Sequence, residues 1–199
     1  TQDSVLYTYL LKRSLFVEKP TLFVGESGTA KTVTIQNHLA QLENEKFLLL
    51  NINFSSRTTS MDVQRNVEEN VDKRTGKVYG PTFGKKLIVF VDDMNMPKVD
   101  IYGTQQPIAL LLFLMAHSSM YDRSKDLDLR TYKDLLYVGA MGPPGGGRNA
   151  VDPRFVTLFN VFNLVPPSEE VLKHIYGSII STYVTEFSDS VKDAAGNIT

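Results

Sequence analysis

The sequence contains no cysteine, which excludes disulfide bonds, thiolate zinc sites and cysteine nucleophiles. It also lacks a long apolar run. The longest, around Ile108–Met115, is far shorter than the about 20 residues that a membrane-spanning helix needs. No charged and then apolar N-terminal segment of the secretory kind is present. These absences predict a cytoplasmic chain that makes no contact with a membrane.

An excess of charge is missing as well. The chain has 21 Lys and Arg residues and 22 Asp and Glu residues, with a formal net charge of −1. Such a balance offers no general attraction for nucleic acid or for an anionic membrane. We therefore expect no nucleic-acid partner, and any anion site must be local.

The remaining composition is that of a soluble globular protein, with 42% hydrophobic and 22% charged residues. A length of 199 residues suits one domain, or one domain and a fragment of a second. The chain begins at Thr1 and ends in a polar stretch, Asp193–Thr199. We expect it to be a piece of a longer protein.

Short apolar runs alternate with helical periodicity along most of the chain. Runs of this kind suit strands that are buried on both faces of a parallel sheet. The five candidate strands are Thr21–Val24, Phe47–Ile52, Leu87–Val91, Leu135–Ala140 and Val156–Leu164. Helices are predicted after the first strand, from Ser60 as N-cap, over Ile108–Tyr121 with Pro107 in the first turn, and from Ser168. This alternation predicts an α/β fold with a five-stranded, mostly parallel sheet flanked by helices.

Two stretches interrupt the alternation. Thr75–Lys86 carries three glycines and a proline, which predicts a hairpin or loop inserted just before the third strand. Gly142–Arg148, which reads GPPGGGR, follows the fourth strand directly.

The loop Gly25–Thr32, GESGTAKT, is a candidate phosphate-binding loop between the first strand and the next helix. In such a loop, backbone N–H groups wrap the phosphates of a nucleotide at a helix N-terminus. Lys31 supplies a charge at the β- and γ-phosphates, and the Thr32 hydroxyl ligates Mg²⁺. The predicted nucleotide-binding residues are Gly25, Glu26, Ser27, Gly28, Thr29, Ala30, Lys31, Thr32 and Val33.

Ala30 breaks the strict pattern, since a glycine is expected before the lysine. Its methyl group is small, so we expect the loop to form with some loss of affinity.

The apolar run Leu87–Val91 ends in Asp92 and Asp93. An acidic residue at the end of a buried strand next to the phosphate-loop strand is suited to hold the Mg²⁺ water shell, which predicts Asp92 as a metal residue. Asp93 stands where a catalytic acid would polarise the attacking water. Because a misplacement of about 1 Å costs on the order of 10²-fold in rate, an aspartate where glutamate is usual predicts slow turnover.

Four segments together resemble the axonemal dynein heavy chains, and within them the third of the six AAA+ modules of the motor ring. They are GESGTAKTVTIQN (25–37), NINFSSRTTSMDVQRNVEENVDKRTG (51–76), VFVDDMNMPKVDIYGTQQPIALL (89–111) and AMGPPGGGRNAVDPRF (140–155). The resemblance extends from about Val5 to Tyr183. It implies an AAA+ P-loop large subdomain over residues 1–167, with the phosphate-loop strand central. Residues 168–199 would begin a truncated helical small subdomain.

The resemblance also implies a function. The parent would be an ATP-driven, minus-end-directed microtubule motor in the axoneme of cilia and flagella. This module would be a regulatory site for ATP or ADP with Mg²⁺, and its partners would be adjacent AAA+ modules of the same chain. Microtubules would be bound only by distant parts of the parent. A free-standing P-loop kinase or GTPase fits poorly, because the sequence shows no base-recognition motif or second-substrate lid.

The resemblance carries over residue by residue. Lys31, Thr32 and Asp92 match the nucleotide and metal positions, and Asp93 matches the catalytic acid with the substitution noted. A polar sensor residue is usual where Gly142 stands, and this departure also implies weak hydrolysis. Arg154 is the candidate arginine finger for the neighbouring module, with Arg148 as a rival. Two hypotheses stay open: a slow active ATPase, and a module that holds nucleotide with negligible turnover.

Overall fold

The computed structural model describes residues 1–82, 84–123, 127–184 and 187. They form two compact units, one of Gln2–Leu164 and one of Val165 onward together with Thr1. The boundary at Leu164 lies close to the predicted end of the first domain at residue 167. The assignment of 168–199 to a small subdomain stays a prediction, and positions 185–186 and 188–199 of it lie outside the described residues.

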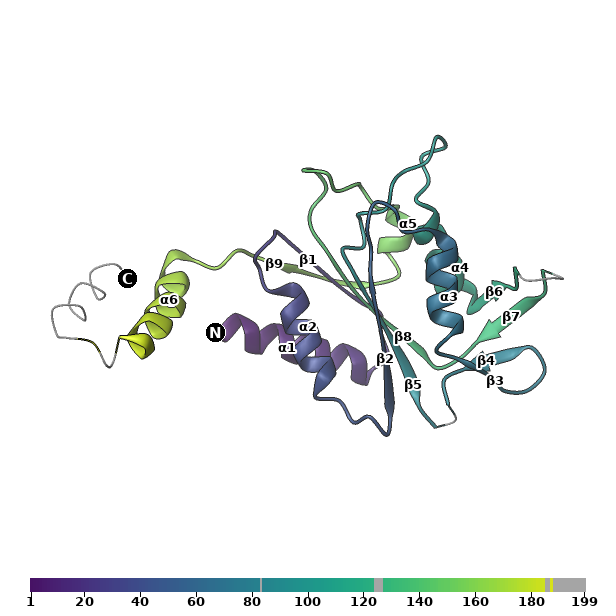
Figure 1. Ribbon diagram of the computed structural model, residues 1–199, viewed down its shortest axis with the longest axis horizontal. Helices are drawn as coiled ribbons and strands as arrows, with labels where there is room; N and C mark the ends of the chain where they lie inside the picture. Colours follow the sequence, from purple (N-terminus) through teal and green to yellow (C-terminus); the bar gives the residue numbers. More distant parts are fainter. Residues whose placement is uncertain (83, 124–126, 185–186, 188–199) are drawn as a thin grey trace. The chain divides into compact units, whose positions relative to one another are not determined.

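The larger unit is built on a five-stranded parallel sheet (Figure 1). The strands are β1 (Thr21–Gly25), β2 (Phe47–Asn53), β5 (Lys86–Asp92), β8 (Leu135–Met141) and β9 (Asn160–Leu164). Their order is β2-β5-β8-β1-β9, and every neighbouring pair is parallel. The predicted fold class is confirmed.

Two expectations about this sheet are wrong. β8 lies between β1 and β5, so the strand that ends in Asp92 does not adjoin the phosphate-loop strand. β8 is also the middle strand, whereas β1 is interior but off-centre. The sheet still brings the ends of both strands to one edge, because all its strands run the same way.

The last strand is shorter than predicted. Residues Pro153–Val156 form a short helix, α5, and β9 begins only at Asn160. The Asp152 side chain caps α5 by accepting a hydrogen bond from the Arg154 backbone N–H at 2.9 Å. Pro153 supplies a backbone angle suited to the first turn of a helix. Cap and proline together override the apolar run that predicted a strand.

Helices cover both faces of the sheet. α1 (Gln2–Phe16) and α2 (Lys31–Ala40) lie on one face, and α3 (Ser60–Glu68) and α4 (Gln106–His117) on the other (Figure 1). Alternate residues of β5 enter the two cores: Leu87, Val89 and Val91 pack under α3 and α4, and Ile88 and Phe90 under α1 and α2. Burial on both faces explains the continuous apolar run of β5.

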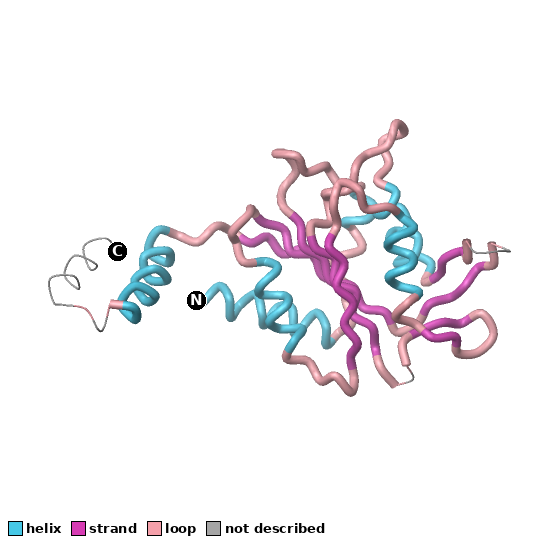
Figure 2. The backbone as a smooth tube through the Cα atoms, viewed as in Figure 1, coloured by secondary structure: helices cyan, strands magenta, loops and turns pink. Residues whose placement is uncertain are grey.

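The larger unit also contains a second, four-stranded sheet (Figure 2). It comprises β3 (Asp72–Lys73), β4 (Val78–Gly80), β6 (Ser119–Tyr121) and β7 (Leu129–Tyr132), in the order β3-β4-β7-β6. The antiparallel pair of β3 and β4 supplies the hairpin expected before the third main strand. The predicted helix over Ile108–Tyr121 ends at His117, because Ser118 is left-handed with φ 50° and the chain turns into β6.

Helix starts follow capping chemistry. α3 is capped by Thr59 rather than by the predicted Ser60, and Thr59 forms a reciprocal capping box with Asp62. Pro107 lies in the first turn of α4, as predicted. In the smaller unit, α6 (Glu169–Tyr183) starts after Ser168, whose hydroxyl accepts from the Val171 N–H at 3.4 Å. None of the described helices has both the length and the apolar character needed to cross a membrane.

Candidate nucleotide-binding site

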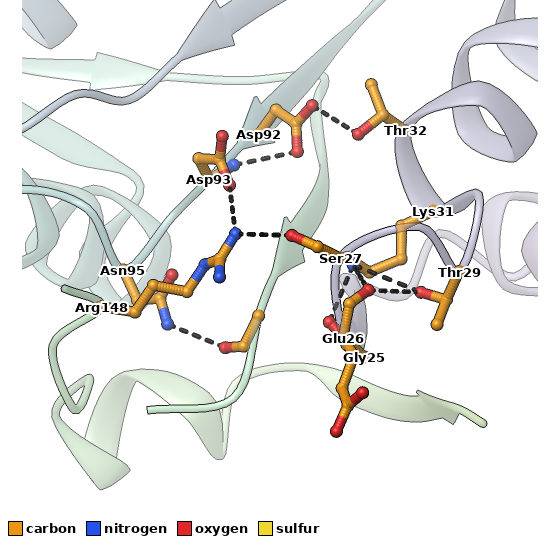
Figure 3. Close-up of polar contacts among 11 residues, drawn as sticks. Gly25, Glu26, Ser27, Thr29, Lys31, Thr32, Asp92, Asp93, Asn95 and Arg148 are labelled. Carbon is orange, nitrogen blue, oxygen red and sulfur yellow. Dashed lines mark hydrogen bonds and ion pairs between the residues drawn. The ribbon is translucent and has the colours of Figure 1, made fainter. Parts of the chain in front are cut away.

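The candidate site lies at the carboxyl edge of the main sheet. The loop after β1, the last residue of β5 and the segment after β8 all meet there (Figure 3). In open parallel α/β sheets, ligands bind outside this edge. The strand order therefore brings together residues from three distant parts of the sequence.

The loop after β1 depends on two glycines and one strained residue. A Cβ at Gly25 would lie 2.7 Å from the Leu164 carbonyl oxygen of β9, so only glycine allows this close approach. Gly28 has φ 85°, which glycine adopts without strain. Ala30 has φ 59° and ψ 25°, a left-handed conformation that costs a non-glycine residue roughly 1–2 kcal/mol. The loop thus forms with alanine at position 30, and Ala30 bears backbone strain that a glycine would not.

α2 begins at Lys31 with its positive end exposed. Ala30 gives it no side-chain cap, and its first turn contains no acidic residue. The first N–H groups of any helix lack intrahelical partners, and the helix dipole adds partial positive charge there. The α2 N-terminus is therefore suited to a phosphate group.

The Lys31 ammonium lies against the loop. It donates hydrogen bonds to the carbonyl oxygens of Gly25 at 2.8 Å and Glu26 at 2.7 Å, and to the Thr29 hydroxyl at 3.3 Å. Burial, followed by the nearby Arg148 charge, lowers the pKa of Lys31, while Asp92 and Asp93 act in the opposite direction. The Lys31 ammonium therefore lies close to three other charged side chains, those of Arg148, Asp92 and Asp93.

Thr32 and Asp92 meet across the site. The Thr32 hydroxyl donates a hydrogen bond to Asp92 Oδ2 at 2.7 Å. Hydroxyl and carboxylate oxygens suit Mg²⁺, which prefers a few protein oxygens together with waters and substrate phosphates. Within the described ranges, no three His, Asp or Glu side chains gather into a metal-binding group. The pair therefore fits a magnesium ion that is held mainly by a nucleotide.

Asp93 follows in an unusual backbone conformation. Its φ is 49°, its N–H donates to Asp92 Oδ1 at 2.9 Å, and its side chain is 53% exposed. Gly142 lies after β8 and offers no side chain. Its carbonyl oxygen instead accepts a hydrogen bond from Asn95 Nδ2 at 2.8 Å. The predicted catalytic acid is thus half-exposed, and the residue at the predicted sensor position provides only its backbone.

The two arginines lie in different surroundings. Arg148 Nη2 is 3.2 Å from the Ser27 hydroxyl and 3.9 Å from Asp93 Oδ1, inside the chain's own site (Figure 3). Arg154 has an 82% exposed side chain and pairs with Asp152 at 2.9 Å. The sequence prediction considered Arg148 only for a neighbouring module. The glycine run before it, Gly145–Gly147, is a sequence feature that could have drawn attention to this arginine, but it does not indicate the contact with Ser27.

Other predicted residues contribute less. The Glu26 side chain is exposed, and the residue contributes its backbone carbonyl. Val33 is 56% exposed and follows Thr32 in α2. Asn95 was missed by the sequence prediction. It is fully buried and connects the segment after β5 to the segment after β8.

Comparison with known proteins agrees with this geometry. A family model described as "P-loop containing dynein motor region" matches residues 1–167. The chain is 53% identical over 199 residues to dynein axonemal heavy chain 10 of Homo sapiens. It is 53% identical over 197 residues to the dynein-1-alpha heavy chain of the flagellar inner arm I1 complex of Chlamydomonas reinhardtii, and 43% identical over 185 residues to dynein axonemal heavy chain 12 of Mus musculus.

These alignments cover 100%, 98% and 92% of the chain, but only 4%, 4% and 6% of the relatives. The chain therefore spans a small part of the length of each heavy chain that it matches. The matched residues 1–167 include the loop Gly25–Thr32, the Thr32–Asp92 pair and the parallel sheet. The chain belongs to the family of the P-loop containing dynein motor region.

Proposed function

We propose that this chain is an ATP-binding regulatory AAA+ module of an axonemal dynein heavy chain, the third module of the motor ring. The observation that carries the proposal is the contact between Thr32 and Asp92 at 2.7 Å, directly beside Lys31 at the α2 N-terminus. These are the metal and phosphate groups of a P-loop site, brought together from two distant segments.

Each residue has a role in binding. The loop N–H groups and Lys31 neutralise the phosphates of ATP or ADP, and Thr32 and Asp92 hold Mg²⁺ between protein and nucleotide. When bound, the metal neutralises charge on the β- and γ-phosphates. Gly25 and Gly28 let the backbone come close enough to do this.

Slow or absent hydrolysis is the second part of the proposal. Asp93 is one methylene shorter than the usual glutamate, is half-exposed and lies 3.9 Å from Arg148, which competes for its carboxylate. Gly142 cannot orient an attacking water with a side chain. The alternative, an actively hydrolysing module, is favoured by the carboxylate of Asp93, which still follows Asp92 directly.

At the level of the parent protein, we propose an ATP-driven, minus-end-directed microtubule motor of the ciliary or flagellar axoneme. The relatives are named as axonemal and flagellar dynein heavy chains. The direct partners would be adjacent AAA+ modules of the same chain, and microtubules would be contacted by other parts. Arg154, which is exposed and paired with Asp152, would serve as the arginine finger for the neighbouring module's nucleotide.

A titration of the chain with fluorescent ATP in the presence of Mg²⁺ tests the proposal. We expect Lys31→Ala to lose detectable binding. Lys19→Ala, an exposed lysine just before the amino end of β1, should bind like the parent chain because it lies at the opposite edge of the sheet. Undiminished affinity of Lys31→Ala would show that the phosphate-site assignment is wrong.

A further inference from the structure

Arg148 is presented to the site by a tight glycine turn. The backbone groups of Gly145 and Arg148 pair with each other in both directions at 3.0 Å. The two residues between them, Gly146 and Gly147, have φ 57° and 88°. Positive φ at both central positions is typical of a type I′ turn, which favours glycine. The three-glycine sequence therefore serves to reverse the chain and fix the place of Arg148.

Two asparagines fasten this loop to the segment that follows Asp93. Asn95 Nδ2 donates to the Gly142 carbonyl oxygen at 2.8 Å, and the Asn149 N–H donates to the Asn95 carbonyl oxygen at 3.0 Å. Asn149 Nδ2 also donates to the Pro97 carbonyl oxygen at 2.8 Å. The loop is thus held on both sides of its turn, and the side chain of Arg148 is directed from a fixed base.

The Arg148 side chain packs directly against Gly142, in the space that a side chain at position 142 would occupy. A Cβ on Gly142 would lie 2.6 Å from Arg148 Nε and 2.7 Å from Arg148 Cδ. Side-chain atoms that close do not coexist, so the guanidinium side chain occupies the space that a sensor side chain at this position would need. Glycine at 142 is what admits the arginine.

The surroundings of Arg148 suit an anion. Its guanidinium lies between the Ser27 hydroxyl of the phosphate loop and the Asp93 carboxylate. Arg148 and Lys31 are close enough for the charge of Arg148 to lower the pKa of Lys31, after the effect of burial. Arg148 Nε is buried and has no hydrogen-bond partner among the described residues. The charges of Arg148 and Lys31 and the unpaired Nε–H donor of Arg148 together suit a phosphate group, which would accept hydrogen bonds from both side chains.

We propose that Arg148 binds the γ-phosphate of the nucleotide in its own module and thereby distinguishes ATP from ADP. This inference rests on the proposed function. The terminal phosphate is assigned because Asp93, at the predicted catalytic-acid position, adjoins the guanidinium. The loop N–H groups hold the inner phosphates, and Lys31 reaches the β- and γ-phosphates, so Arg148 adds a second cation at the terminal one. Arg148 acts in cis, and Arg154, on the surface, is left for the neighbouring module.

The affinities of the chain for MgADP and for the Mg²⁺ complex of the β,γ-imido analogue of ATP test this assignment. We expect Arg148→Ala to weaken the analogue about tenfold or more, as for loss of a charged hydrogen bond, and ADP by less than about twofold. Arg148→Gln, which keeps length without charge, should behave like Arg148→Ala. Arg65→Ala, an exposed arginine on α3, is the matched control. Equal affinities in Arg148→Ala and the parent, or equal losses for both nucleotides, would overturn the inference.

A double-mutant cycle of Gly142→Ala and Arg148→Ala tests whether the two positions share the same space. Gly142 does not have the positive φ that disfavours alanine, so Gly142→Ala should displace Arg148 without straining the backbone. We expect it to weaken the analogue in the parent chain and to have little further effect in Arg148→Ala. Independent, additive losses would contradict the shared-space argument.

The outcomes separate this inference from the proposed function. If Lys31→Ala loses both nucleotides while Arg148→Ala loses neither, the nucleotide site stands and the role of Arg148 fails. If Lys31→Ala binds both nucleotides normally, the proposed function itself fails. Thermal unfolding of each variant confirms that a loss of binding does not come from unfolding.

Discussion

The Thr32 hydroxyl donates a hydrogen bond to the Asp92 carboxylate at 2.7 Å, although the two residues are 60 positions apart in the sequence. Thr32 lies in the first turn of α2, and Asp92 is the last residue of β5. One strand, β8, separates β5 from the strand that leads into α2. The strand order of the sheet, rather than local sequence, thus brings together the two oxygens that are suited to Mg²⁺.

Replacing Thr32 by valine tests this pair. The variant keeps the shape of the side chain and removes the hydroxyl, so we expect it to lose most of the gain in ATP affinity that Mg²⁺ provides. Its binding of ATP in EDTA should change by less than about threefold, because Lys31 and the loop remain. Fluorescence titrations with and without Mg²⁺ measure both quantities.

Thr34→Val is the control for that experiment. Thr34 lies two residues further along α2, where a side chain points to a different face of the helix. Its Mg²⁺ dependence should equal that of the parent chain. An unchanged Mg²⁺ dependence in Thr32→Val would remove Thr32 from the metal site.

The left-handed backbone at Ala30 predicts a stabilising substitution. Ala30→Gly relieves roughly 1–2 kcal/mol of strain at φ 59°, against a greater loss of chain entropy of about 0.4–1 kcal/mol. We expect the free energy of unfolding to rise by about 0.8 kcal/mol, the midpoint of a difference of roughly 0–1.6 kcal/mol. Urea denaturation measures it.

Ala116→Gly supplies the contrast. Ala116 is exposed within α4, where glycine costs about 0.5–1 kcal/mol. The two alanine-to-glycine changes should therefore shift stability in opposite directions. Destabilisation of similar size by both would mean that Ala30 is not strained.

His38 predicts a dependence of stability on pH. It is buried on α2, and burial, followed by the charge of Lys12, lowers its pKa below the ordinary value of 6.5. The unfolded chain then binds a proton more readily than the folded chain, so stability is complete above pH 6.5 and falls as the pH drops below it.

Thermal unfolding of the parent and of His38→Gln between pH 7.5 and 5.0 checks this sign. The variant should lose less stability over that range than the parent. Parallel profiles for the parent and His38→Gln would show that His38 does not contribute.

Much of the fold was predictable because buried parallel strands have a simple pattern. Four of the expected strands lie within a residue or two of β1, β2, β5 and β8, since their burial on both faces produces continuous apolar runs. The fifth expected strand, Val156–Leu164, is wrong in its first half. The Asp152 cap and Pro153 start a helix that includes Val156, and the strand begins only at Asn160. The short strands β6 and β7 carry no pattern long enough to recognise. α1 was not predicted either.

The candidate site likewise has residues that the sequence predicts and residues that only the fold reveals. The phosphate loop and Asp92 were predictable, because their residue types occur at fixed spacing next to a strand. The position of Arg148 was not, because Ser27, which it contacts, lies 121 residues away and only the fold brings them together. The strain at Ala30 and the burial of Asn95 likewise belong to the folded backbone and not to composition.

The central claim is that the module binds ATP at Gly25–Thr32 and keeps it largely intact. A single-turnover experiment tests it, with radiolabelled ATP bound to a dynein heavy chain that contains this sequence and whose other nucleotide sites are disabled. We predict that most bound ATP is recovered unchanged after about 100 s, roughly 10³ times the cycle of a typical enzyme, and that Asp93→Asn makes little difference. Conversion to ADP within about a second, slowed strongly by Asp93→Asn, would contradict the account.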